Sequence, residues 1–74
     1  GLYTQVGNWW DRKGLNEIDM IALNEFDQTA VAAEIKRNPK KISMSDLQTK
    51  VDALPKSEFK QYQFELKGLS IEDM

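Results

Sequence analysis

Two short apolar segments separated by a polar stretch constrain most strongly what this chain can fold into. Residues 18–23 (IDMIAL) and 30–33 (AVAA) are rich in aliphatic side chains and are short for helices. The residues between them, 24–29, have a turn-like composition. The pattern therefore predicts an antiparallel hairpin, with strands over about 17–23 and 30–37 and its tip at residues 26–27.

A tip at this position brings charged side chains together across the two strands. Asp19 then lies opposite Glu34, and Glu17 lies opposite Lys36. Strand side chains alternate between faces, so all four share one face. Two carboxylates held together either share a proton or share a cation, and hard divalent ions take oxygen ligands. Two acids and a lysine on one strand pair indicate metal-assisted phosphodiester hydrolysis.

The alternative is that these charged residues only form the solvated face of the hairpin, because antiparallel sheets commonly leave one face wet. The core side would then consist of the alternate residues, Ile18, Met20, Ala22, Val31, Ala33 and Ile35. However, Ile21, Leu23 and Ala32 share the charged face. That face is therefore expected to be partly covered, with the acids at the border of a buried surface.

Composition limits the chemistry that is open to the chain. With 74 residues we expect a single domain that buries about 60% of its unfolded surface. The chain has no cysteine and no histidine, which excludes zinc sites and nucleophile systems based on these residues. Any metal must therefore be held by oxygen. No run is long or apolar enough to span a membrane, and the lack of cysteine fits a reducing, cytoplasmic location.

The basic residues are clustered although the net charge is slightly negative, at −2. That balance argues against a free-standing, high-affinity nucleic-acid binder. Yet Arg37, Lys40 and Lys41 follow directly after Lys36. One interpretation is an ordinary solvated loop. The other is that these three residues contact a DNA backbone next to the carboxylates.

Further elements are expected on both sides of the hairpin. Residues 3–10 are predicted to form a first strand, on which Trp9 and Trp10 point to opposite faces. One tryptophan is expected in the core, and the other stacks on a base or packs against another module. Residues 11–16 form a polar turn. Ser43 or Ser45 is predicted to cap a helix of about ten residues. Its apolar stripe consists of Met44, Leu47, Val51 and Leu54. A last strand is expected over 59–66, and Ser70 is predicted to open another helix.

These residues carry a resemblance to known families. Asp19 followed by Glu34-Ile35-Lys36 resembles the PD-(D/E)xK pattern of restriction-endonuclease-like and Holliday-junction-resolvase-like nucleases. More narrowly, the segments 7–13 (GNWWDRK), 17–19 (EID) and 66–70 (LKGLS) resemble the C-terminal domain of a family of prokaryotic P-loop ATPases of unsettled function. The resemblance covers nearly the whole chain.

The resemblance implies a fold and a set of site residues. The fold would be α/β and restriction-endonuclease-like, with a mixed sheet in which an antiparallel hairpin is followed by a helix and a strand, and without the family's opening helix. Asp19 and Glu34 would ligate Mg²⁺ or Mn²⁺ together with the backbone carbonyl of Ile35, and Lys36 would be the catalytic lysine. Gln48 matches part of a further motif that some relatives carry, but its partner position is occupied by Asp52.

Two functions from different classes follow from this resemblance. In the first, residues 1–74 are the C-terminal piece of a larger protein and form a metal-dependent DNA nuclease, or a DNA-binding domain, appended to a P-loop ATPase. In the second, the domain is a catalytically silent interaction module that regulates or targets the ATPase. The ATPase motif itself is absent, so no ATP site is expected in this chain. Loss of the opening helix would expose apolar sheet surface, which predicts a homodimer or another form of self-association.

Overall fold

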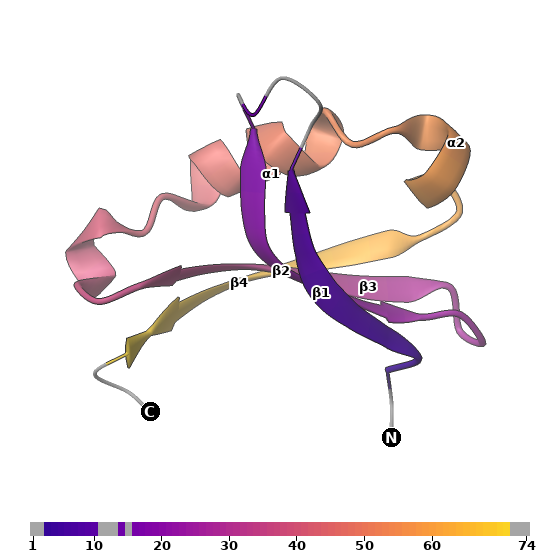
Figure 1. Cartoon of the computed structure of the whole chain (residues 1–74), viewed down its shortest axis with the longest axis horizontal. Coiled ribbons are helices and arrows are strands. Elements are labelled where there is room, and N and C mark those ends of the chain that lie inside the picture. Colours follow the sequence, from indigo (N-terminus) through magenta and orange to yellow (C-terminus); the bar gives the residue numbers. More distant parts are fainter. Residues whose placement is uncertain (1–2, 11–13, 15, 72–74) are drawn as a thin grey trace.

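The described part of the chain forms one mixed sheet with helices in a single crossover (Figure 1). The computed structural model describes residues 3–10, 14 and 16–71. Strands β1, β2 and β3 are antiparallel neighbours, and β4 runs parallel to β3. The elements are β1 Gln5–Trp10, β2 Glu17–Asn24, β3 Thr29–Lys36, the 3-10 turn η1 Pro39–Lys41, α1 Met44–Asp52, α2 Lys56–Phe59 and β4 Gln63–Ser70. The predicted α/β class with a mixed sheet is confirmed.

The hairpin register is the one that the sequence predicts. Strands β2 and β3 pair from Met20 opposite Ala33 to Asn24 opposite Thr29, so paired residue numbers have a constant sum. A hairpin with its tip at residues 26–27 gives paired residues this same sum of numbers. A register slip by one residue would move every side chain to the other face of the sheet. The pattern of apolar residues and the turn therefore specify the same pairing.

Asn24 closes the turn through its side chain. Its Oδ1 accepts hydrogen bonds from the amides of Phe26 and Asp27, at 3.0 and 3.1 Å. Gln28 has a left-handed backbone with φ of 57°, which brings the chain back into β3. An asparagine that hydrogen-bonds the backbone two residues ahead is a common way to start a turn.

β2 contains a bulge next to β1. Gly7 pairs with Ile21, whereas Trp9, two residues later in β1, pairs with Ile18, three residues earlier in β2. The extra residue lies within 19–20, and it interrupts the alternation of side chains. Ile18 and Ile21 therefore both join the same core cluster. The prediction that they lie on opposite faces is wrong for this reason.

The helices cover the face of the sheet that carries Ile21 and Ala32. Leu47 of α1 and Leu54, just after it, are buried against these residues and Ile18. Figure 1 shows the helices on this side of the sheet. This is the face on which the charged residues were expected, and most of the predicted core side is the face without helices. Ile18, Ala22, Val31 and Ala33 of that predicted set are nevertheless buried. None of the described helices is long and apolar enough to cross a membrane.

The opposite face of the sheet has no helix from the described residues over it (Figure 1). Trp9 packs against the core cluster, whereas Trp10 is 60% exposed, so the two tryptophans do point to opposite faces. Val6, which pairs with Ala22, is 64% exposed. Large apolar side chains therefore remain open to solvent on this face.

Helix α1 begins where the sequence places one of its two alternative caps. Ser43 is the N-cap, and its Oγ accepts a hydrogen bond from the Asp46 amide at 3.2 Å. The helix is nine residues long. Of the predicted apolar stripe, Leu47 is buried, whereas Met44 at the start of the helix is 42% exposed.

The last strand starts later than the sequence predicts. After Pro55 the chain forms α2, in which the amides of Glu58 and Phe59 both donate to the Pro55 carbonyl at 3.1 Å. β4 therefore begins at Gln63 rather than at residue 59. Ser70 ends β4, is buried, and donates from Oγ to the Arg37 carbonyl at 3.3 Å. Ile71, which follows Ser70, is in a 3-10 turn, and the rest of the predicted helix lies outside the described part. The structure therefore leaves the predicted cap at Ser70 untested. The predicted turn over 11–16 and the end of the predicted last helix fall largely on residues 11–13, 15 and 72–74, outside the described part.

The crossover passes so close to β4 that residue 68 has no room for a side chain. A Cβ at Gly68 would lie 2.6 Å from Cγ2 of Ile42, a contact that forces the crossover to move. We predict that Gly68→Ala lowers the free energy of unfolding by about 1–3 kcal/mol. Gly7→Ala is the matched control, because a Cβ there meets no atom within 4 Å. Urea unfolding followed by tryptophan fluorescence measures both, and equal stability of the two variants would contradict this account of Gly68.

Candidate functional site

Asp19 lies at the bulge and contacts the backbone of the facing strand. The β2–β3 ladder ends at Met20 opposite Ala33. Beyond that pair, the Ile35 amide donates to Oδ2 of Asp19 at 2.8 Å. A side-chain carboxylate thus replaces a strand carbonyl as the acceptor for this amide. The carboxylate is thereby held against the backbone that joins Glu34 to Lys36.

Glu34 is a buried carboxylate with two different partners. It is 8% exposed, on the face that α1 covers. Its Oε2 accepts from the Ser43 amide at 3.2 Å, and its Oε1 lies 3.7 Å from Nζ of Lys36. Buried carboxylates need such partners, because an unpaired buried charge is very costly. Glu34 therefore links β3 to the first turn of α1 and also orients Lys36.

Sequence reasoning found Ser43 as a helix cap but missed its contact with Glu34. Both roles come from the same residue, since the Ser43 hydroxyl caps α1 and the Ser43 amide meets the carboxylate. The signal that could have suggested the contact is the short connection from β3 to a serine that caps a helix. Such a connection returns the N-terminus of the helix, with its free amides, to the end of the strand.

The basic residues after β3 lie on the exposed loop next to these carboxylates. Arg37, Lys40 and Lys41 are all exposed. Asn38 caps the η1 turn by accepting from the Lys40 amide at 3.0 Å, which gives the loop a defined start. Lys36, the last residue of β3, adds a further cation next to this loop, and its side chain is 43% exposed. The loop thus presents several cations to solvent beside the partly buried Glu34.

Three of the charged residues predicted for the site lie at the same end of β3, whereas Glu17 and Gln48 are not part of this group. Asp19 contacts the Ile35 amide, and the side chains of Glu34 and Lys36, on either side of Ile35, contact each other. Glu17 is exposed and pairs with Trp10 of β1, so it is not part of this group. The Gln48 side chain donates to Oδ1 of Asp52 at 2.8 Å on the surface of α1, away from the gathered residues.

A divalent cation would find few side-chain ligands at this position. Among the described residues, no group of three or more acidic side chains is placed to hold a metal ion. Two carboxylates and a backbone carbonyl remain, with water completing the coordination, as Mg²⁺ often prefers. Oδ1 of Asp19 makes no hydrogen bond within the described part of the chain, while Oε1 of Glu34 has only the long contact with Lys36. These donors are all oxygens, the kind of ligand that a hard, hydrated divalent ion takes.

Fold and site together define a small mixed α/β domain in which two carboxylates and a lysine meet at the end of a strand. Comparison with family models gives a match over residues 2–50, roughly two thirds of the chain, to DUF234, a family described as archaea bacterial proteins of unknown function. The chain belongs to this family. The matched segment contains Asp19, the Glu34–Lys36 segment and the basic loop. No curated protein and no solved structure matches the chain.

The hydrogen bond between Asp19 and Ile35 should contribute measurably to stability. Asp19→Ala leaves the Ile35 amide without its acceptor, which is expected to lower the free energy of unfolding by about 1–3 kcal/mol. Asp19→Asn keeps a side-chain oxygen in the same place and should cost less. Glu17→Ala, which removes an exposed acid from the same strand, is the control. If Asp19→Ala unfolds at the same urea concentration as the wild type, the bond has no structural importance.

Proposed function

We propose that this domain binds Mg²⁺ or Mn²⁺ through Asp19, Glu34 and the carbonyl of Ile35, and that it cleaves DNA as a restriction-endonuclease-like nuclease. The observation that carries the proposal is the position of the Asp19 carboxylate on the Ile35 amide, between Glu34 and Lys36. This contact brings an acid from a second strand to the segment that already holds an acid and a lysine. The mixed sheet with its hairpin and crossover is the support for this fold type.

Hydrolysis of a phosphodiester forms a bond from a water oxygen to phosphorus, breaks the bond to the leaving oxygen and places a proton on that oxygen. A bound divalent ion supplies a water of lowered pKa and polarises a phosphoryl oxygen. Lys36 carries a partly exposed ammonium that can turn from Glu34 toward the phosphate and offset its developing negative charge. Glu34 is held by Ser43, so its position does not depend on that movement.

The proposal places the DNA backbone along the loop after β3. Arg37, Lys40 and Lys41 are exposed and can pair with phosphates there, which is a sequence-independent form of binding. We further propose that the domain works as part of a P-loop ATPase, as the resemblance of its sequence implies.

Metal binding provides a first test that does not require turnover. We expect Mn²⁺ titrated into the chain to bind in a calorimeter, and Glu34→Gln to weaken binding by at least about tenfold, since even outer-shell substitutions cost that much. Glu17→Gln removes the same charge nearby and should bind Mn²⁺ like the wild type. Equal binding by Glu34→Gln and the wild type would contradict the proposed metal site.

Cleavage provides the second part of this test. We expect Mg²⁺- or Mn²⁺-dependent nicking by the full-length ATPase-containing protein, with weak activity from this chain alone because its hold on DNA is limited. Asp19→Ala or Lys36→Ala should abolish nicking in the full-length protein and leave ATP hydrolysis largely intact. The nuclease proposal is wrong if that protein nicks no DNA with either metal, or if both variants nick normally.

A second candidate function is an interaction module, and the uncovered face of the sheet favours it. Trp10 and Val6 are both more than half exposed on that face. Glu65 and Lys67 pair with residues of β3 on the same face, at Val31 and Ala33. A twofold axis would place each glutamate opposite the lysine of a second copy, which makes a homodimer the occupant that this face suits.

Self-association should depend on Trp10. We expect sedimentation equilibrium to show a dimer of the wild-type chain and a shift toward monomer in Trp10→Lys. Phe26→Lys, which changes an exposed aromatic residue at the hairpin tip instead, should behave like the wild type. A wild-type chain that stays monomeric at high protein concentration would contradict the dimer.

A further inference from the structure

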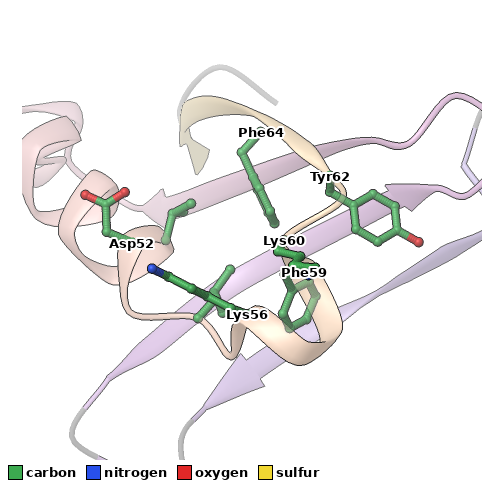
Figure 2. Close-up of a pocket in the computed structure, with 8 residues that line it drawn as sticks. Asp52, Lys56, Phe59, Lys60, Tyr62 and Phe64 are labelled. Atoms are coloured by element: carbon green, nitrogen blue, oxygen red, sulfur yellow. The ribbon is translucent and has the colours of Figure 1, made fainter.

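A hollow at the other end of β3 combines aromatic side chains with lysines (Figure 2). It has a volume of about 520 Å³, within the usual range for ligand sites. Its walls come from the end of α1, from α2 and from the start of β4. The lining residues are Val51, Asp52, Leu54, Lys56, Phe59, Lys60, Tyr62 and Phe64.

The hollow is separate from the carboxylate group. Phe64 pairs with Ala30 near the start of β3, whereas Glu34 pairs with Gly68 toward its end. Four residues of strand separate the two levels, which corresponds to roughly 13 Å. A ligand in the hollow would therefore not touch the proposed metal site.

The apolar part of the hollow is largely aromatic. The aromatic residues Phe59, Tyr62 and Phe64 are each partly exposed, so part of each side chain is open to solvent. Phe59 and Phe64 meet at a tilt of 59°, with ring centroids 6.2 Å apart. Leu54 is buried beneath them. Partly exposed rings over a buried floor offer flat surfaces on which another ring can stack.

The charged part of the hollow is biased toward anions. Lys56, the first residue of α2, and Lys60, its C-cap, are both exposed and four residues apart, so they lie near each other on one side of this turn. Figure 2 shows the Lys56 amine reaching across the hollow toward Asp52. One oxygen of Asp52 already accepts from Gln48, and no ion pair within the described part holds either lysine. The lining therefore has two available cations against one engaged acid.

We infer that this hollow binds an unpaired nucleotide of single-stranded DNA, with its base against the aromatic rings and its phosphates at Lys56 and Lys60. Stacking platforms beside lysines are how proteins hold single strands without reading their sequence. A base within a duplex stays stacked on its neighbours and cannot enter. The choice of DNA rests on the proposed function, and the hollow adds that the DNA must present a single-stranded region.

The charge requirement is tested with a fluorescein-labelled oligothymidylate in EDTA, by anisotropy, so that no metal site can contribute. Lys60→Gln should weaken binding about fivefold and lower the slope of log K against log[salt] by about 0.7. Lys50→Gln removes the same charge from α1 beside the hollow without lining it, and should change neither quantity. Equal effects of the two variants would overturn the inference.

The stacking requirement needs a separate variant. Tyr62→Leu keeps apolar bulk and removes a ring, and we expect it to weaken oligothymidylate binding about tenfold. Circular dichroism shows whether the variant is folded. Amide chemical shifts of the wild-type chain give an independent readout, with changes expected across residues 51–64 on addition of the oligonucleotide.

Three outcomes would each overturn the inference: shift changes confined to residues 37–41, duplex DNA bound as tightly as the single strand, or unchanged binding by a folded Tyr62→Leu. None of these would contradict the nuclease proposal, because the measurement contains no metal, and shift changes confined to residues 37–41 would agree with the DNA path proposed for that loop. Conversely, absence of nicking would leave the binding result in place.

Discussion

A carboxylate from β2 serves as the acceptor for a backbone amide of β3, and the arrangement of this end of the sheet depends on that contact. The Asp19 side chain reaches the Ile35 amide where regular pairing between the two strands has ended. An amide left without an acceptor in the protein interior is costly. The bulge in β2 supplies the change of direction that brings Asp19 to this position. The strands can then part without leaving the amide unsatisfied, and the side chains of Glu34 and Lys36 gather around the same backbone.

Glu34 extends this local arrangement to the helix layer. It is almost fully buried, yet both of its oxygens have a partner, one on the N-cap residue of α1 and one on Lys36. This position makes Glu34 a link between β3 and the start of α1. Both partners offset the cost of burying a carboxylate, so the residue is placed by the sheet and by the helix together.

The hairpin was predictable because its signals are local. Two apolar runs and the turn chemistry around Asn24 specify the register without reference to the rest of the chain. The bulge was not predictable, since it appears only when β1 pairs with β2 and requires Trp9 to meet Ile18. The face that the helices cover was not predictable either, because it depends on the path of the crossover between β3 and β4. Glu34 and Lys36 were predicted as neighbours and are in contact, whereas the Ser43 contact depends on how the crossover returns to the sheet. The hollow was missed because residues 59–62 were interpreted as part of a strand. In the structure Phe59 ends α2 and β4 begins only at Gln63.

The parallel pairing of β4 has a consequence for the order in which this sheet assembles. The first three strands are neighbours in sequence and join through short connections, but β4 reaches β3 only after the whole crossover. Closing that longer loop carries a larger entropic cost, so β4 is expected to arrive last in folding and to leave first in partial opening. When it leaves, the backbone of β3 that carries Glu34 and Lys36 becomes a free edge, and unpaired edges accept strands from other chains. The integrity of the carboxylate group is thus coupled to whether this edge is occupied by the chain's own last strand.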